Sequence, residues 1–531
     1  MAHHLAIASS SSRRLLDRTV TREASSDVRP RELRVTMSSP LRNAGWALST
    51  LTWSIRRARL NATLRWGAHA NEYLEPMIAW VFFLTFSGTG FRALIGWVGY
   101  GIIVVLSAAV FIAMFVIAGR RVTIRRVPWT IAAFLLVCWM SALWAEYPGI
   151  SALASLGSTL SALIGIMIAI AVPLERLIDA FAAAMRWSVG ISLVMELWCA
   201  IFVGHPIVPV WLRGQGNVGA TQLWTESALF RGGPIQGFVG NRNPLAAIAL
   251  FGIICTVIQL RARRMSSRRA LTWFALYAAT LALTRSATVF VALLACAGVF
   301  LVGTVLRRVR AHRRQRVLRI SAMALLIVSV VGALLYAPIA EFIGRDADLT
   351  GRSDIWRAVF ELWKQRPIGG WGWVMLWPPW IPMYRDLVIR QDGAPTPHAH
   401  NAFVDVSFQT GLIGLVVFVI AICVIGIRVL RVAIRRIDGD VYSLAPALMM
   451  TAILVQSLTE SRLLFEGTWI LFVALATWLV VRVEQEDSEV GVGVLSLPVP
   501  PSPGQRGRAP QDTTYSADRR GRVPAQPPES R

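Results

Sequence analysis

The chain has 531 residues, a formal net charge of +24 at pH 7 and 55% apolar residues. Its mean hydropathy of +0.54 is too high for a soluble protein of this length. The composition therefore excludes an ordinary soluble protein and predicts a membrane protein.

In chain order, the first predicted element is a basic tail over residues 1–70, which we expect to be cytoplasmic and largely disordered. Residues 1–45 are polar and rich in Arg and Ser, and they lack the apolar core and small-residue cleavage site of a signal peptide. We expect a second disordered cytoplasmic tail over residues 484–531, where acidic residues give way to Pro, Gly and Arg. The membrane domain is predicted between the tails, at residues 71–483.

Apolar runs fill this domain, and each span needs roughly 20 residues to cross about 30 Å of hydrocarbon. Because no water in the hydrocarbon can satisfy exposed backbone groups, the spans must be helices in contact with membrane lipid. We therefore predict an all-α, polytopic membrane protein with about twelve transmembrane helices, eleven being the alternative count. The predicted spans lie near 74–90, 94–118, 128–145, 151–172, 187–204, 243–260, 270–284, 287–306, 318–337, 410–430, 443–460 and 466–482.

The arginines are concentrated in short connections between these spans, at 120–126, 261–269, 307–319 and 428–436. With about twelve spans, all four connections fall on the same side as both termini, which is the pattern of cytoplasmic loops. The excess of basic residues is therefore explained by the membrane topology, and no nucleic-acid partner is expected. Both termini are predicted to be cytoplasmic, and a large loop at 338–409 is predicted to be extracytoplasmic.

Motifs that bind nucleotides or catalytic metals are not evident. The sequence has no GKS/T loop and no HExxH, so no cofactor is expected. The five cysteines fall within predicted spans and lack CxxC spacing, which is typical of packing thiols rather than of disulfides or metal ligands. We therefore expect no metal site.

The predicted outer loop contains a short amphipathic helix. Ile355, Val359 and Leu362 recur at helical spacing and form one apolar face. Ser353 is the expected N-cap, and the helix is expected to end before Pro367.

Five tryptophans follow along this loop, at Trp363, Trp371, Trp373, Trp377 and Trp380. Their indole rings suit the headgroup layer, where one polar edge stays hydrated. A helix that merely rests on the bilayer is one interpretation of the loop. The concentration of charged residues beside the helix favours a functional site.

Arg352 directly precedes the expected cap, near the positive end of the helix dipole. Its guanidinium matches phosphate oxygens, so Arg352 and the helix N-terminus together predict a pyrophosphate site. His398 and His400 lie just before the next predicted span, and a histidine can take a proton from a sugar hydroxyl. A solvated or salt-bridged side chain is the alternative for each of these residues.

Two more arginines are expected at the outer boundary, Arg242 in a GNRNPL segment and Arg285 in a TRS segment. Each could simply snorkel from a span end, but with Arg352 they would form a cradle for a polyanion. Glu196 and Asp405 could orient these arginines. Glu196 is equally expected to be a structural hydrogen-bonding partner within the bundle.

Four segments together resemble the O-antigen ligase and polymerase superfamily of bacterial membrane glycosyltransferases. They are GNRNPLA at 240–246, LTRSA at 283–287, GRSDIWRAVFELWKQRPIGGWGW at 351–373 and HAHNAFVDVSFQTGLIGL at 398–415. The similarity covers roughly residues 230–480, with a looser match in the first five predicted spans.

The resemblance implies a membrane glycosyltransferase fold with a large extracytoplasmic loop. It implies metal-independent, inverting transfer of a glycan from a polyprenyl-pyrophosphate donor to a lipid, sugar or protein hydroxyl on the outer face of the cytoplasmic membrane. Carried onto this chain, Arg242, Arg285 and Arg352 would hold the pyrophosphate.

His400 would be the general base, with His398 as the alternative and Asn401 as a secondary site residue. Within the superfamily, a polymerase of lipid-linked repeat units is the alternative activity. A transporter or flippase of lipid-linked glycans fits the span count, but the sequence shows no repeat between its halves. A non-catalytic partner in a cell-envelope complex is the last alternative.

Overall fold

The structure is a computed structural model that describes residues 67–495, apart from 68, 215–217, 343–351, 391 and 440. Both predicted disordered tails lie largely outside the described residues. The described residues belong to one unit of the chain, which begins at Gly67. Their regular elements are all helices, beside two isolated β-bridges. The predicted all-α class is confirmed.

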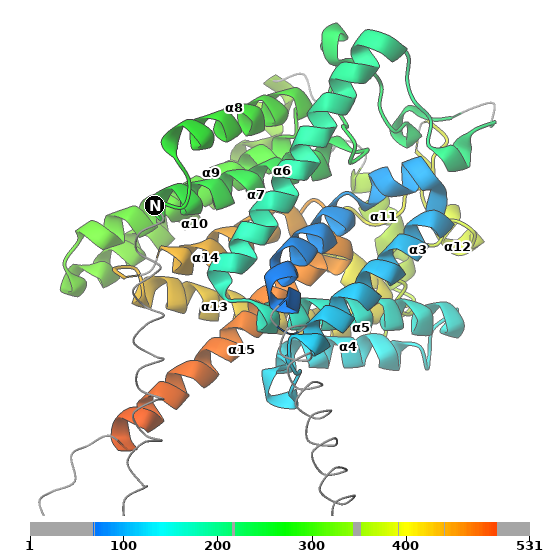
Figure 1. Ribbon diagram of the computed structural model, residues 1–531. Coiled ribbons are helices and arrows are strands. Elements are labelled where there is room, and N and C mark those ends of the chain that lie inside the picture. The colour runs from blue at the N-terminus through cyan, green and yellow to red at the C-terminus, as the bar shows by residue number, and fades with distance from the viewer. Residues whose placement is uncertain are drawn as a thin grey trace, which may run out of the picture. The chain divides into compact units, whose positions relative to one another are not determined.

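A helix overlaps each of the twelve ranges in which we predicted a span, in some cases only in part. The first consists of residues 69–86. The others are α3 (Gly88–Ile117), α4 (Trp129–Ser141), α5 (Pro148–Ala171), α6 (Leu174–Trp198), α7 (Arg242–Arg261), α8 (Ser267–Thr284), α9 (Ala287–Arg308), α10 (Ala311–Phe342), α13 (Ala402–Arg435), α14 (Ala445–Ser457) and α15 (Glu466–Leu495) (Figure 1). The loop helices α11 (Arg352–Trp363) and α12 (Pro382–Arg385) lie between α10 and α13. α15 continues beyond residue 483, where we expected the membrane domain to end.

Six helices of the described chain are long and apolar enough to cross a membrane. They are α3, α5, α6 with its π-helical extension Cys199–Val203, α7, α9 and α13. α4 and the segment Tyr442–Ser457 are apolar but shorter. These helices make the protein a multi-pass membrane protein, and the count of twelve stays a prediction.

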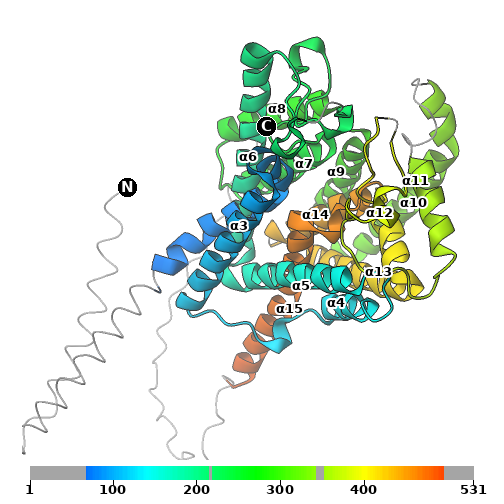
Figure 2. The same cartoon turned by 90° about the vertical axis from the view of Figure 1, so that its right-hand side faces the viewer.

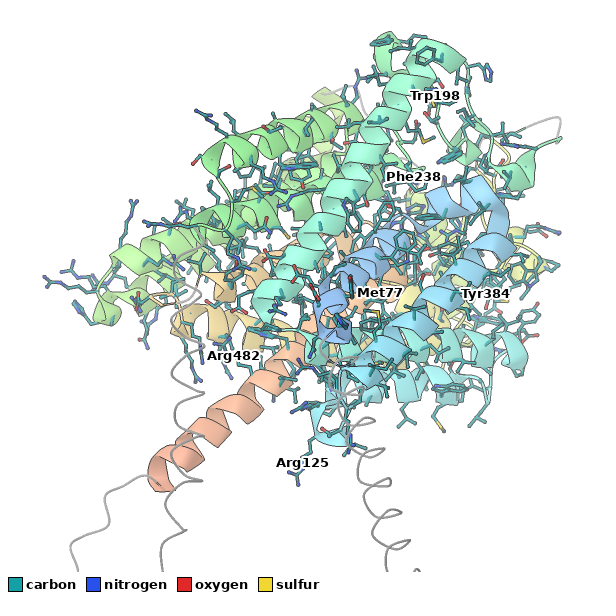
Figure 3. The ribbon with its side chains drawn as sticks, in the orientation of Figure 1. Met77, Arg125, Trp198, Phe238, Tyr384 and Arg482 are labelled. Carbon is teal, nitrogen blue, oxygen red and sulfur yellow. The ribbon has the colours of Figure 1, made fainter. Side chains whose placement is uncertain are left out.

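The helices pack in pairs that are often distant in sequence. α5 packs along α15 and lies beside α4, α7 contacts α6 and α8, and α14 contacts α9 and α13 (Figures 1 and 2). Figure 3 shows Arg125 and Arg482 in the lower part of the view and Trp198 and Phe238 in the upper part. The basic connection that contains Arg125 therefore lies at the opposite end of the helices from the connection that follows α6.

α13 begins at Ala402, well before the apolar run that starts at Gly411. Gly411 has φ 64° and kinks the helix. Backbone groups of the 367–372 segment bond to the backbone on both sides of the kink, at 2.8–3.3 Å. The early start places the His-Asn pair directly at the helix N-terminus.

The loop between α10 and α13 has a small core of its own. The apolar face of α11, at Ile355 and Val359, packs with Trp377 and Tyr384 of the same loop. This packing holds α11 against the loop, so the helix does not merely rest on a bilayer.

The tryptophans of this loop differ in burial. Trp373 is fully buried, and its indole Nε1 donates to Ser158 Oγ of α5 at 3.0 Å. Trp377 is also buried, whereas Trp380 is 71% exposed. A place in the headgroup layer is therefore wrong for Trp373 and Trp377, which anchor the loop to the protein.

Gly411→Ala should destabilise the protein. A Cβ at this position would lie 2.1 Å from the carbonyl oxygen of Ile368, and the positive φ disfavours any L side chain. We expect a loss of about 1–3 kcal/mol from the backbone strain alone, seen as a lower midpoint of thermal unfolding in detergent. Gly426→Ala in the same helix is the control, because its Cβ would meet only Met450 Cε at 4.0 Å. Equal midpoints for the two variants would contradict the kinked geometry.

Candidate functional site

Glu460, in the connection between α14 and α15, is the centre of a polar cluster. Its carboxylate Oε1 accepts hydrogen bonds from Arg352 Nη2 at 3.3 Å and from Asn243 Nδ2 at 2.8 Å. The other oxygen, Oε2, lies 3.3 Å from His400 Nδ1. Three segments that are far apart in the sequence thus converge on one carboxylate, whose side chain is only 10% exposed.

The groups around Glu460 keep it ionised. Burial raises the pKa of its carboxyl, but His400, His398 and Arg352 outweigh burial and hold that pKa below its ordinary value. A buried carboxylate requires such partners, because its isolated charge would cost several kcal/mol. The cluster therefore places a fixed negative charge beside a histidine.

The hydrogen bonds of His400 define its tautomer. A guanidinium has donors only, so Arg390 Nη2, 2.9 Å from His400 Nε2, must donate to that nitrogen. The ring proton then lies on Nδ1, which donates to Glu460 Oε2. This is the tautomer of a general base, with a lone pair on Nε2 and the other nitrogen held by a carboxylate.

His398 has a different environment, although its ring centroid lies only 4.2 Å from that of His400. Its Nδ1 accepts the backbone N–H of His400 at 3.1 Å, and the residue is buried. Burial, followed by the neighbouring His400 ring, lowers the pKa of His398 well below its ordinary value. These contacts favour His400 over His398 as the base and give His398 a place in shaping the turn.

Arg352 is the first residue of α11, so the helix begins one residue earlier than the predicted cap. Ser353 lies inside the helix and is not its N-cap. The start at Arg352 directs its guanidinium to Glu460, with only 13% of the side chain exposed. A positive charge at a helix start is unfavourable by itself, and the buried carboxylate offsets it.

The motifs around Arg242 and Arg285 reach the cluster through the residues that follow them. Asn243 donates to Glu460, and its Oδ1 accepts from Ser286 Oγ at 2.9 Å. Arg242 and Arg285 are themselves exposed. The structure thus brings both segments to the cluster but leaves their arginines at its rim.

Asn401 and Asp405 build the turn that presents His400. Asn401 caps α13, and its Oδ1 accepts two backbone N–H groups of the first helical turn at 2.9 and 3.2 Å. The buried Asp405 accepts from the backbone N–H of Ala399 at 2.9 Å and from the hydroxyl of Ser461. Asp405 therefore stabilises the turn. Among the described residues it makes these contacts, not the predicted contacts with arginines.

Glu196 holds the connection between α6 and α7. Its Oε1 accepts the backbone N–H groups of Gln236 and Gly237 at 3.0 and 2.6 Å, and Thr225 Oγ1 donates to the carboxylate at 3.1 Å. These contacts correspond to the structural alternative for Glu196, not to the orientation of arginines.

The comparison with known families bears on the same segments. Residues 270–419 match the family model of the O-antigen ligases. This match supports the O-antigen ligase and polymerase superfamily for the segment. The resemblance carried by the motifs is thereby confirmed over these residues. No curated protein matches the chain.

The matched segment contains Arg285, Arg352 and His400, but it begins after Asn243 and ends before Glu460. Sequence reasoning missed the roles of Glu460, Asn243, Ser286 and Arg390. Asn243 and Ser286 lie in the GNRNPLA and LTRSA segments, directly after the candidate residues Arg242 and Arg285. Glu460 gave one signal, as an acidic residue in a short connection on the predicted outer side.

The site also offers a possible cation geometry. His398, His400 and Glu460 each have one ligand atom within 4.8 Å of the others. Arg390 already occupies Nε2 of His400, and Arg352 shares the carboxylate of Glu460. Both guanidinium groups place positive charge beside these atoms, so the arrangement favours an anion over a cation.

Proposed function

We propose that this protein transfers a glycan from a polyprenyl-pyrophosphate donor to a hydroxyl group of a lipid, sugar or protein acceptor. The observation that carries the proposal is the His400–Glu460 pair, in which a neutral imidazole is oriented by a carboxylate beside Arg352. The superfamily supports a ligase or glycosyltransferase-like enzyme.

In the proposed reaction, His400 Nε2 accepts the proton of the acceptor hydroxyl while its oxygen forms a bond to the anomeric carbon. The bond from that carbon to the pyrophosphate oxygen breaks, and its electron pair leaves with the polyprenyl pyrophosphate. Attack on the face opposite the leaving group inverts the anomeric centre. The arginines supply the positive charge for the leaving group, so the mechanism needs no metal.

The two parts of the site make comparable contributions. A positioned general base contributes typically about 10²–10⁴-fold in rate. One well-placed donor to a developing negative charge contributes about 10²–10³-fold. Arg352 donates to Glu460 of the His400–Glu460 pair, and Arg242 and Arg285 at the rim would bind the outer phosphate.

We place this site on the outer face of the cytoplasmic membrane, with both termini inside. The support is that four helices, α3, α7, α9 and α13, run in the same direction. The last three begin beside the site, and Arg92 near the start of α3 contacts Glu466 at 2.7 Å, just after the Glu460 connection. All four end at the arginine-rich connections. Each has 20 residues or more, so its end lies at least about 30 Å along the helix from its start. Basic connections of this kind face the cytoplasm.

Reconstitution into liposomes separates this activity from transport. With a labelled polyprenyl-pyrophosphate glycan and an added acceptor, we expect the donor to be consumed and polyprenyl pyrophosphate to be released as the acceptor gains the glycan. Extension of the glycan by its own repeat unit would identify the polymerase alternative. Movement of intact donor across the bilayer, without consumption, would identify a flippase and overturn the proposal.

A further inference from the structure

The transfer mechanism leaves the position of Arg390 unexplained. Its Nη2 lies 2.9 Å from His400 Nε2, on the lone pair that has to receive the proton of the acceptor hydroxyl. As long as this hydrogen bond exists, His400 has the right tautomer but cannot act as a base. A residue that both prepares and covers the base is a candidate for control by substrate.

A tight turn holds Arg390 in this position. Its backbone N–H donates to Ala394 O at 2.9 Å, and its carbonyl accepts from Gly393 N at 2.9 Å. Asp392, within the turn, accepts from the backbone N–H of Thr221 at 2.9 Å and from its hydroxyl at 2.5 Å. The connection between α6 and α7 thus fastens the turn from outside the loop. The backbone is held, and the long side chain is the part that can move.

The surroundings of the guanidinium make an anion a better partner than the imidazole. Burial, together with the charge of Arg352, lowers the pKa of Arg390, and Asp392 and Glu460 only partly compensate. Its observed hydrogen bond is to an uncharged nitrogen. Phosphate oxygens accept two parallel bonds from arginine and form stronger, charge-assisted bonds.

We propose that Arg390 caps the lone pair of His400 Nε2 while the site is empty and moves onto the pyrophosphate of the donor when the donor binds. The move uncovers the base at the moment when the leaving group is in place. Without the donor, the base is unavailable to water or to the acceptor. The inference rests on the proposed function, because it takes the ligand of the site to be a pyrophosphate. The donor shifts the side chain only by binding the uncapped state more tightly.

Acylation by diethyl pyrocarbonate tests the cap, because the reagent attacks the lone pair of a neutral imidazole. The rate at His400 would be followed by mass spectrometry on the full-length protein in detergent, with and without inorganic pyrophosphate. In wild type, we expect slow labelling that pyrophosphate accelerates. In Arg390→Ala, we expect labelling that is faster by about tenfold or more and no longer accelerated by pyrophosphate.

Arg385→Ala is the matched control. It removes an arginine from the same loop, but that arginine is exposed and pairs with its neighbour Asp386. This variant should label like wild type. Arg390→Lys, which keeps one charged donor, should give an intermediate rate and serves as the second variant if Arg390→Ala does not fold.

Unchanged labelling in the Arg390 variants, or pyrophosphate that fails to accelerate labelling in wild type, would overturn the cap. The outcome does not depend on turnover, so it is distinct from a failure of the proposed function. If pyrophosphate uncovers His400 but no polyprenyl-linked glycan is transferred, the proposed transfer reaction is contradicted, whereas the anion-controlled cap is supported.

Discussion

Arg352→Ala should lower the rate constant of glycan transfer by about 10²–10³-fold, the typical effect of removing one donor to a developing negative charge. The loss has two physical origins. The leaving pyrophosphate loses one of the positive charges that bind it, and Glu460 loses one of the partners that hold its pKa low. A carboxyl that takes up a proton more readily orients His400 less firmly.

Two companion variants separate these effects from general damage. Arg357 lies on the same helix as Arg352, but its side chain is exposed and pairs with Asp354 at 2.9 Å on the surface, so Arg357→Ala is the control. It should retain wild-type transfer. Arg352→Lys keeps the charge but loses the planar fork, so it should recover only part of the rate. Initial rates with labelled donor in liposomes measure all three. A wild-type rate in Arg352→Ala would remove Arg352 from the site.

Much of the fold could be predicted because its signal is local. A membrane span is about 20 consecutive apolar residues, and the described helices appear in each range where such a run occurs. Helix starts were harder to predict. α13 begins at Ala402 because Asn401 caps it, while the apolar run that marks the span begins only at Gly411. Polar first turns do not register in a hydropathy pattern.

The site was partly predictable for the same reason. Arg352 and His400 stand in motifs whose residue types indicate phosphate binding and proton transfer. Glu460 is 60 residues from His400 and 108 from Arg352, so no local pattern connects it with either. Only the packing of α14 and α15 beside α13 brings the carboxylate to both.

The tryptophans show the opposite error. Trp373 has the composition of a membrane-interface residue, but the loop carries it into the helices, where Ser158 binds its indole nitrogen. Gly372 allows this approach, because a Cβ there would lie 2.3 Å from the Cβ of Ala145. The residue type alone predicted an interfacial position for Trp373. Its burial depends on a close backbone approach that only the fold determines.

Removal of the His400 imidazole should have the largest effect on activity, about 10²–10⁴-fold on the rate constant of transfer. His400 has φ 51°, a conformation that strains alanine but that asparagine adopts more readily. His400→Asn therefore removes the base with little backbone strain, and His400→Ala adds the strain. His205→Ala, at an exposed histidine in the connection between α6 and α7, is the control and should retain full transfer.

The most direct measurement is the rate at which the liposome-reconstituted His400→Asn variant releases polyprenyl pyrophosphate and glycosylates the acceptor, with its binding of the donor measured in parallel. We expect donor binding close to that of wild type and transfer reduced by about 10²-fold or more. Transfer at the wild-type rate would contradict the assignment of His400 as the base, and with it the catalytic role of the Glu460 cluster.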